Sequence, residues 1–303
     1  MVFWRARKSI GVTQRGAVLA TMRTSDTWER GDPYEHYVGR WSRRVAPLFL
    51  SWLAIPGQRR WLDLGCGTGA LSAAILDHGS PASVVGVEPS EGFLQTARER
   101  LVGRMEFRRG SAAEIPLDAG AVDVSVSGLA LNFVPDAGVA LAEMARVTAP
   151  GGTIAAYVWD YGGRMELVRS FWDAAVELDP GAANADEAAR FPMCRPEALI
   201  ELFSGAGLAE ARVTAIDVPT HFATFEDYWS PFLGGQGPAP AYAMALEDAA
   251  RSRLRESLRG RLPIQPDGSI SLIARAWAVR AGRLAAERRG PRSEEHTSEL
   301  QSQ

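Results

Sequence analysis

Short apolar runs and amphipathic segments alternate along the first half of this chain. The apolar runs predict strands at 61–64, 84–88, 105–109, 121–127 and 153–159, and helical spacing of the apolar residues predicts helices at 70–75, 90–101 and 137–147. Crossovers between parallel strands are right-handed, so this regular alternation predicts an α/β fold with a parallel sheet and helices on both faces.

The second half has a less regular pattern. We expect helices at 165–178 and 195–206, and the best remaining strands at 210–218 and 269–279. Aromatic residues at approximately helical spacing also predict a leading helix within 33–53, interrupted by Pro47. The segment 232–242 is crowded with glycine and proline, which predicts a shaped loop; a lid over a substrate and a plain connector both fit it.

A glycine-rich turn follows the first strand. Gly65, Gly67 and Gly69 come directly after the apolar run 61–64, and Asp63 stands within that run. Glycine reaches positive φ, and without a Cβ it lets backbone amides approach a ligand closely. The turn also satisfies the relaxed dinucleotide pattern through Ala70, so it predicts a nucleotide-like ligand without fixing which one.

An acidic residue ends the second predicted strand. Glu88 lies about twenty residues beyond the turn, where a ribose-binding acid is expected. A carboxylate at that point can accept hydrogen bonds from both ribose hydroxyls, and charge-assisted bonds are stronger than neutral ones. Glu88 is therefore predicted to bind the ribose.

These segments together resemble the motifs of class I S-adenosylmethionine-dependent methyltransferases. The resemblance rests on the acid and glycines of 63–69, on Glu88, and on the segment 110–116, GSAAEIP, where Ser111 stands in place of the family's usual aspartate. Within the family the chain looks closest to the ubiquinone/menaquinone-biosynthesis type. The resemblance implies a Rossmann-like, seven-stranded, mostly parallel sheet with the last strand antiparallel and with helical and loop cap inserts.

The resemblance also implies a cofactor, a reaction and a set of site residues. We expect S-adenosyl-L-methionine as cofactor, methyl transfer to a small-molecule oxygen or carbon acceptor, and no metal. No catalytic residue is singled out, because in-line displacement needs a base only for a protonated acceptor. The expected cofactor-binding residues are Asp63, Gly65, Cys66, Gly67, Gly69, Glu88, Pro89, Ser111, Ala112, Ser127, Leu129, Tyr37 and Arg40. The candidates for acceptor contact are Asn132, Trp159, Asp160, Tyr161, His36 and His221.

Two other functions stay open at this point. One is a nicotinamide-dependent oxidoreductase that shares the glycine turn; it would need a catalytic Tyr-x-x-x-Lys or an equivalent, and Lys8 is the only lysine in the sequence. The other is a protein that binds S-adenosylmethionine without turnover.

Composition and net charge limit the classes of partner that we expect. The net charge of −3 gives no overall basic surface, so we expect no nucleic-acid partner. Two cysteines, Cys66 and Cys194, suit a reducing cytoplasm, and no apolar run approaches the length of a membrane span. The oligomeric state stays open.

The two ends differ from the rest of the chain. We expect a disordered extension at 1–32, where Met22 is an alternative start, and a methyltransferase domain at 33–282, with its core at 58–160 and inserts at 161–205 and 222–265. Residues 283–303 are expected to be a disordered tail, which from Arg292 to Ser302 resembles a translated sequencing adapter.

Overall fold

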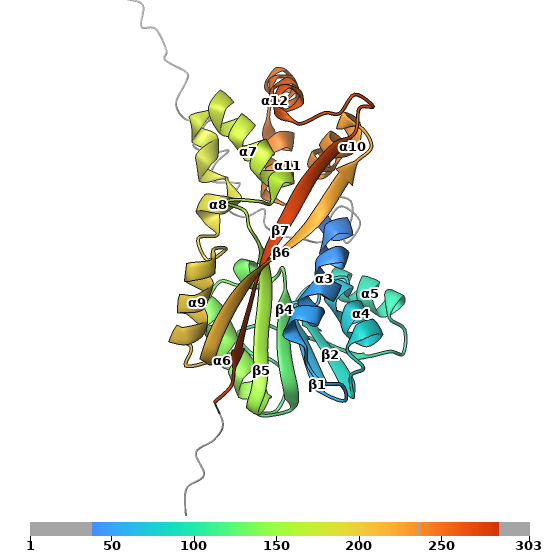
Figure 1. Cartoon of the computed structure of the whole chain (residues 1–303), viewed down its shortest axis with the longest axis vertical. Helices are drawn as coiled ribbons and strands as arrows, with labels where there is room; N and C mark the ends of the chain where they lie inside the picture. Colours follow the sequence, from blue (N-terminus) through green and yellow to red (C-terminus); the bar gives the residue numbers. More distant parts are fainter. Residues whose placement is uncertain (1–37, 236, 285–303) are drawn as a thin grey trace, which may run out of the picture.

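One seven-stranded sheet organises the computed structural model, which describes residues 38–235 and 237–284 (Figure 1). The strand order is β3-β2-β1-β4-β5-β7-β6. β1 to β5 run parallel, and β7 is antiparallel to both of its neighbours. This confirms the predicted fold class. The strands are β1 (Arg60–Leu64), β2 (Ser83–Glu88), β3 (Glu106–Arg109), β4 (Val122–Gly128), β5 (Thr148–Trp159), β6 (Ala209–Phe222) and β7 (Ile270–Gly282).

Helices cover both faces of the sheet because the strand order reverses between β1 and β4. The crossovers α4 (Ala70–His78) and α5 (Glu91–Arg100) lead outward to β2 and β3, and α6 (Ala137–Val147) leads the other way to β5. Right-handed crossovers in opposite directions lie on opposite faces. α3 (Arg40–Leu53) packs beside α4, and α9 (Pro196–Gly205) packs beside α6 (Figure 1). The reversal is also where doubly wound sheets bind their ligands.

Local signals in the sequence fix where several of these elements begin. Ser90 caps α5 by accepting a hydrogen bond from the amide of Phe93, and Asp136 caps α6 by accepting one from Val139. At the opposite end of the sheet the guanidinium of Arg60 forms a two-point contact with Asp123, which ties the starts of β1 and β4 together. These contacts position the carboxyl ends of the strands relative to one another.

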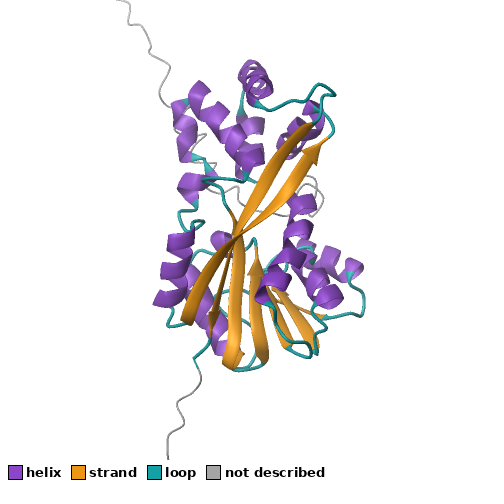
Figure 2. Ribbon diagram, viewed as in Figure 1, coloured by secondary structure: helices purple, strands orange, loops and turns teal. Residues whose placement is uncertain are grey.

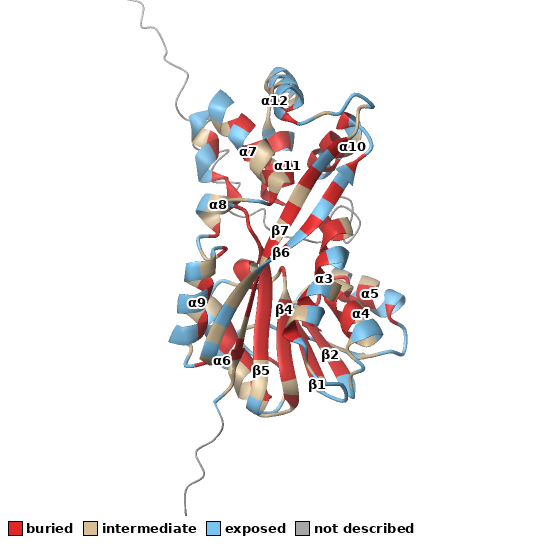
Figure 3. Ribbon diagram, in the orientation of Figure 1, coloured by how far each residue is buried: buried red, intermediate tan, exposed pale blue. Residues whose placement is uncertain are grey.

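The antiparallel pair of β6 and β7 extends beyond the parallel strands, and helices gather around its far end (Figure 2). Here Phe171 stacks on Phe232 with ring centroids 4.5 Å apart, and the hydroxyl of Tyr228 donates to the carbonyl of Leu167 at 3.0 Å. The aromatic side chains are buried, and they belong to the same apolar core as the sheet (Figure 3). Its helices are α7 (Glu166–Leu178), η3 (Pro180–Asn184), α8 (Glu187–Arg190), α10 (Phe225–Trp229), η4 (Ser230–Gly234), α11 (Pro238–Ala245) and α12 (Asp248–Arg261).

The prediction of a loop at 232–242 is wrong. Most of this segment belongs to η4 and α11, and the proline at 238 stands in the first turn of α11, where a missing amide proton costs nothing. Phe232 and Tyr242 are buried against Phe171 and Trp172. The glycines and prolines therefore mark helix ends inside a packed cap.

Several expectations fall outside the described residues. They are those for the extension 1–32, for His36 and Tyr37, and for nearly all of the tail. The division of the chain into a core and inserts stays a prediction. In the described ranges no helix combines the length and the apolar character needed to cross a bilayer.

The packed cap predicts a contrast between two neighbouring residues. Phe232→Ala should lower the free energy of unfolding by about 3–5 kcal/mol, because it removes a buried ring from the stack on Phe171. The change is measured by urea denaturation.

Leu233→Ala is the matched control, since its side chain is 43% exposed; we expect a loss below about 0.5 kcal/mol. Equal and small effects of the two substitutions would contradict a packed cap.

Candidate functional site

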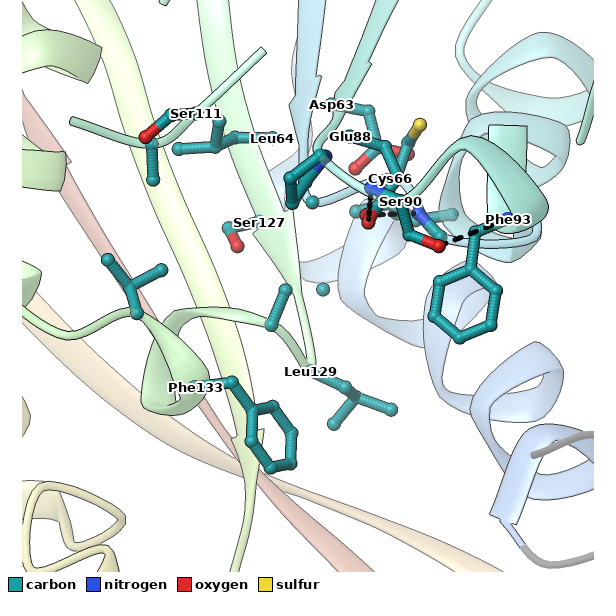
Figure 4. Close-up of a pocket in the computed structure, with 18 of the residues that line it drawn as sticks. Asp63, Leu64, Cys66, Glu88, Ser90, Phe93, Ser111, Ser127, Leu129 and Phe133 are labelled. Carbon is teal, nitrogen blue, oxygen red and sulfur yellow. Dashed lines mark hydrogen bonds between the residues drawn. The ribbon is translucent and has the colours of Figure 1, made fainter. Parts of the chain in front are cut away.

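A cavity of about 510 Å³ opens at the carboxyl ends of β1, β2 and β4 (Figure 4). Ten of the thirteen residues expected to bind the cofactor line it: Asp63, Gly65, Cys66, Gly67, Glu88, Pro89, Ser111, Ala112, Ser127 and Leu129. They come from segments up to 66 positions apart, as the numbers 63 and 129 show. The sheet therefore gathers the sequence motifs around one space.

The turn after β1 brings backbone close to this space. The amides of Gly65 and Cys66 both donate to the carbonyl of Val87 on β2, at 2.8 and 3.2 Å. Gly65 has φ +70°, and a Cβ there would lie 2.5 Å from the Cβ of Ala130. Only glycine satisfies both the left-handed backbone and the close approach.

Gly69 has a different role from the two glycines before it. It has φ +88° and is the N-cap residue of α4, and a Cβ there would lie 3.0 Å from Leu101 and 3.6 Å from Ala97. It does not line the cavity. Gly69 allows α4 to start and to pack closely against α5.

Glu88 is held at the end of β2 by two backbone amides. The amide of Gly67 donates to Oε2 at 3.2 Å, and the amide of Ser90 donates to Oε1 at 3.0 Å. Burial raises the pKa of Glu88 above its ordinary value, while the two amide hydrogen bonds act in the opposite direction. Each oxygen keeps further acceptor capacity, which a pair of ligand hydroxyls can use.

Asp63 is buried at the end of β1, and only one of its two carboxylate oxygens accepts a hydrogen bond. The hydroxyl of Ser72 donates to Oδ2 at 2.6 Å, but Oδ1 has no hydrogen-bond partner. Burial raises the pKa of Asp63 to about 7; the hydrogen bonds from Ser72 lower it, and the charge of Glu88 raises it further. A buried acceptor without a donor costs free energy, so a hydrogen-bond donor or a cation placed at this oxygen would stabilise the site.

The cavity lining is polar in some parts and apolar in others. Ser111, whose hydroxyl accepts from the amide of Ala113 at 3.1 Å, and the ring of Phe93 lie on opposite sides of Glu88 (Figure 4). Leu129 and Phe133 add apolar side chains, and Tyr157 reaches across Gly128, where a Cβ would lie 2.6 Å from the phenol oxygen. The lining can therefore contact both a polar nucleoside and an apolar reacting group.

Two further expected residues, Arg40 and His221, lie outside the cavity lining. Arg40 forms an ion pair with Asp227 at 3.1 Å, and its guanidinium stacks on Trp41 and Phe222. His221 is exposed on the edge strand β6.

Four acceptor candidates are buried and do not line the cavity: Asn132, Trp159, Asp160 and Tyr161. Trp159 ends β5 opposite Ala276, and Tyr161 packs on the ring of Phe191. Asp160 accepts the amide of Arg164 at 2.9 Å. Asn132 is buried in η2 (Leu131–Phe133) with its side-chain nitrogen unpaired.

Sequence reasoning missed several residues that line the cavity. Ser42 comes from α3, Phe93 from the first turn of α5, Phe133 from η2 and Tyr157 from β5. Phe93 lies in the first turn of the helix that begins just after the strand end at Glu88, and this position is a signal that the sequence contains. Ser42 and Tyr157 were not identifiable in this way, because only the packed structure shows which side of α3 and β5 faces the cavity.

The charged residues of the cavity limit which kinds of ligand it can bind. Asp63, Glu88 and Asp136 line it, and among the described lining residues none is lysine, arginine or histidine. A dinucleotide would bring a pyrophosphate with two negative charges toward the carboxylate of Glu88 and keep Asp63 from ionising, which is unfavourable at low dielectric. A nucleoside with a positive charge matches the cavity better.

Comparisons with known proteins agree with this arrangement. The family model described as a methyltransferase domain matches residues 62–156. The chain is 38% identical over 115 residues to a demethylmenaquinone methyltransferase of Clavibacter sepedonicus, which covers 37% of this chain and 43% of that protein. It is 26% identical over 214 residues to a trans-aconitate 2-methyltransferase of Deinococcus radiodurans, covering 68% and 80%.

A solved structure shares the fold. The Haemonchus contortus phosphoethanolamine N-methyltransferase 2 has a TM-score of 0.52 and 18% identity, covering 88% of this chain and 59% of that one. The chain spans less than half the length of the curated relatives with which it is 38% identical.

The close approach of Gly65 to Ala130 predicts that alanine substitution destabilises the protein more at Gly65 than at Gly103, although the two glycines have nearly the same φ. Gly65→Ala should destabilise the protein by at least about 3 kcal/mol, because it adds a clash with Ala130 to the strain of positive φ. Gly103→Ala has φ +68° and nothing within 4 Å, so we expect only about 1–2 kcal/mol. Thermal and urea unfolding measure the stability of both variants, and equal losses would show that the contact with Ala130 does not require glycine at position 65.

Proposed function

We propose, from the premise that residues 62–156 form a class I S-adenosylmethionine-dependent methyltransferase domain, that this chain transfers a methyl group to a small organic acceptor. The observation that carries the proposal is the placement of Asp63 and Glu88 in one cavity without a basic lining residue among those described. The cofactor of this class combines an adenosine with a sulfonium, an ammonium and a carboxylate, and its net positive charge suits a cavity with two acids and a glycine turn.

The residues of the cavity fit the parts of this cofactor. Glu88 has the acceptor capacity for the two ribose hydroxyls, and the unpaired Oδ1 of Asp63 suits a positively charged group. Ser111 and Phe93 would hold the adenine ring by a hydroxyl contact and by ring packing. When bound, S-adenosylmethionine supplies an electrophilic methyl group.

The contribution of the chain to the reaction is alignment and exclusion of water. Leu129, Phe133 and Val134 make part of the cavity lining apolar, which keeps water from the reacting atoms. Holding both reactants in line supplies several kcal/mol of barrier reduction, roughly 7 kcal/mol in favourable cases. The thiol of Cys66 is not suited to act as a nucleophile, because burial and the nearby carboxylates raise its pKa.

We propose an oxygen or carbon atom of the acceptor as the methylated atom. The names of two relatives, a demethylmenaquinone methyltransferase and a trans-aconitate 2-methyltransferase, specify small organic acceptors. The described thiols, Cys66 and Cys194, are free and buried, which fits a protein of the reducing cytoplasm.

The proposal is tested by calorimetry with S-adenosylmethionine against NAD, followed by methyl transfer from labelled cofactor onto a library of phenols, enols and carboxylic acids. Binding of S-adenosylmethionine but not NAD, with label transferred, is the expected result. Binding of NAD alone would support the oxidoreductase. Binding of S-adenosylmethionine without transfer to any acceptor would support a non-catalytic binding protein.

Glu88 provides a sharper test of the cofactor site. Glu88→Ala should weaken binding of S-adenosylhomocysteine by about 1.5–3 kcal/mol, the usual size for a hydrogen bond to a charged group. Isothermal titration calorimetry measures the change. The control is Glu91→Ala, an exposed acid in the next helix, which should leave the affinity unchanged. An unaltered affinity in Glu88→Ala would remove Glu88 from the site.

A further inference from the structure

Asp63 and Glu88 lie on the same wall of the cavity but receive different numbers of hydrogen bonds to offset the cost of burying their charge (Figure 4). Glu88 receives a backbone amide on each oxygen, whereas Asp63 receives the hydroxyl of Ser72 on one oxygen and nothing on the other. Asp63 is therefore the acid whose charge is harder to sustain in the empty cavity.

We propose that Asp63 holds a proton in the cofactor-free protein at slightly acidic pH and releases it to solvent when the cationic cofactor binds. The O–H bond of the carboxylic acid breaks, its electron pair stays on Asp63, and a positive centre of the cofactor takes the place of the proton. This inference rests on the proposed function. It makes Asp63 a residue that selects for cofactor charge.

The neighbours of Asp63 support a protonated state. From β2 the carboxylate of Glu88 disfavours a second negative charge. In the turn the thiol of Cys66 stays neutral, because burial and both acids raise its pKa. From α4 only Ser72 stabilises the charged form of Asp63, through its hydrogen bonds.

The remaining elements around the cavity bring no compensating cation into its described lining. β4 contributes Ser127, and α3 contributes Ser42. On α5, Arg98 acts on Cys66 and is paired with Glu91 at 2.6 Å, and Arg100 donates to the carbonyl of Thr68 in the turn at 3.5 Å. Burial thus dominates at Asp63 and raises its pKa to about 7.

The direction of the pH dependence follows from linkage. Below pH 7 the cofactor must displace the proton of Asp63, so affinity should fall as the pH falls, approaching about tenfold per pH unit. Without cofactor the raised pKa has a second effect: Asp63 stabilises the fold most below its ordinary pKa and loses this contribution as the pH rises through about 7. The empty site is therefore least favourable at the pH where the cofactor binds best.

The experiment counts protons by calorimetry at about pH 6, where an α-amino group is fully protonated and contributes none. Binding enthalpies are measured in several buffers of different ionisation enthalpy, and the slope gives the protons released. S-Adenosylmethionine should release about one proton, and the neutral 5′-methylthioadenosine none. S-Adenosylhomocysteine shows which positive centre acts: equal release assigns the ammonium, and smaller release assigns the sulfonium.

Two variants separate Asp63 from other sources of protons. Asp63→Asn should bind S-adenosylmethionine without proton release, and its melting temperature relative to that of the wild type should increase as the pH rises from about 4 to about 7 and stay constant above that. Ser72→Ala should keep the release but move its midpoint to higher pH, because it removes the hydrogen bond that favours the carboxylate. Ser72→Ala also serves if Asp63→Asn does not fold.

The outcomes distinguish this inference from the proposed function. S-Adenosylmethionine that binds with no proton released, or with the same release in Asp63→Asn, overturns the role of Asp63 and leaves the proposed function standing. Equal release by 5′-methylthioadenosine also overturns it. Failure of S-adenosylmethionine to bind at any pH would instead contradict the proposed function.

Discussion

The burial of two carboxylates at one edge of the sheet is the constraint on which the site depends. Asp63 and Glu88 end adjacent parallel strands, and the register that pairs Leu64 with Val87 fixes their separation. Burying charged groups disfavours folding unless something compensates for them. Backbone amides donate hydrogen bonds to both carboxylate oxygens of Glu88, whereas Oδ1 of Asp63 has no hydrogen-bond partner. The cavity is thus prepared for a cation before any ligand arrives.

The glycine turn makes this arrangement possible. Gly65 and Gly67 allow the chain to reverse directly above the strand ends, so that an amide of the turn reaches Glu88. The reversal of strand order between β1 and β4 leaves room beside the turn. The cap around the far end of the β6–β7 pair belongs to the same apolar core as the sheet, but its described helices do not line this cavity.

The fold was largely predictable from the sequence, because its signals are local. The strands at 84–88 and 121–127 were located within a residue or two, and Ser90 was correctly predicted as the N-cap of α5. The segment 232–242 was not predictable, since glycine and proline mark helix ends as well as loops, and only packing against Phe171 decides between them. For the site, strand ends identified Asp63 and Glu88, but the side-chain direction of Tyr157 depends on how α3 and β5 pack.

A crystal structure with bound S-adenosylhomocysteine would test the central claim most directly. The account predicts both ribose hydroxyls within about 3 Å of the Glu88 carboxylate, with the amino-acid end of the ligand directed toward Asp63. A nucleoside bound elsewhere, or one that leaves Glu88 contacting only the amides of Gly67 and Ser90, would contradict it.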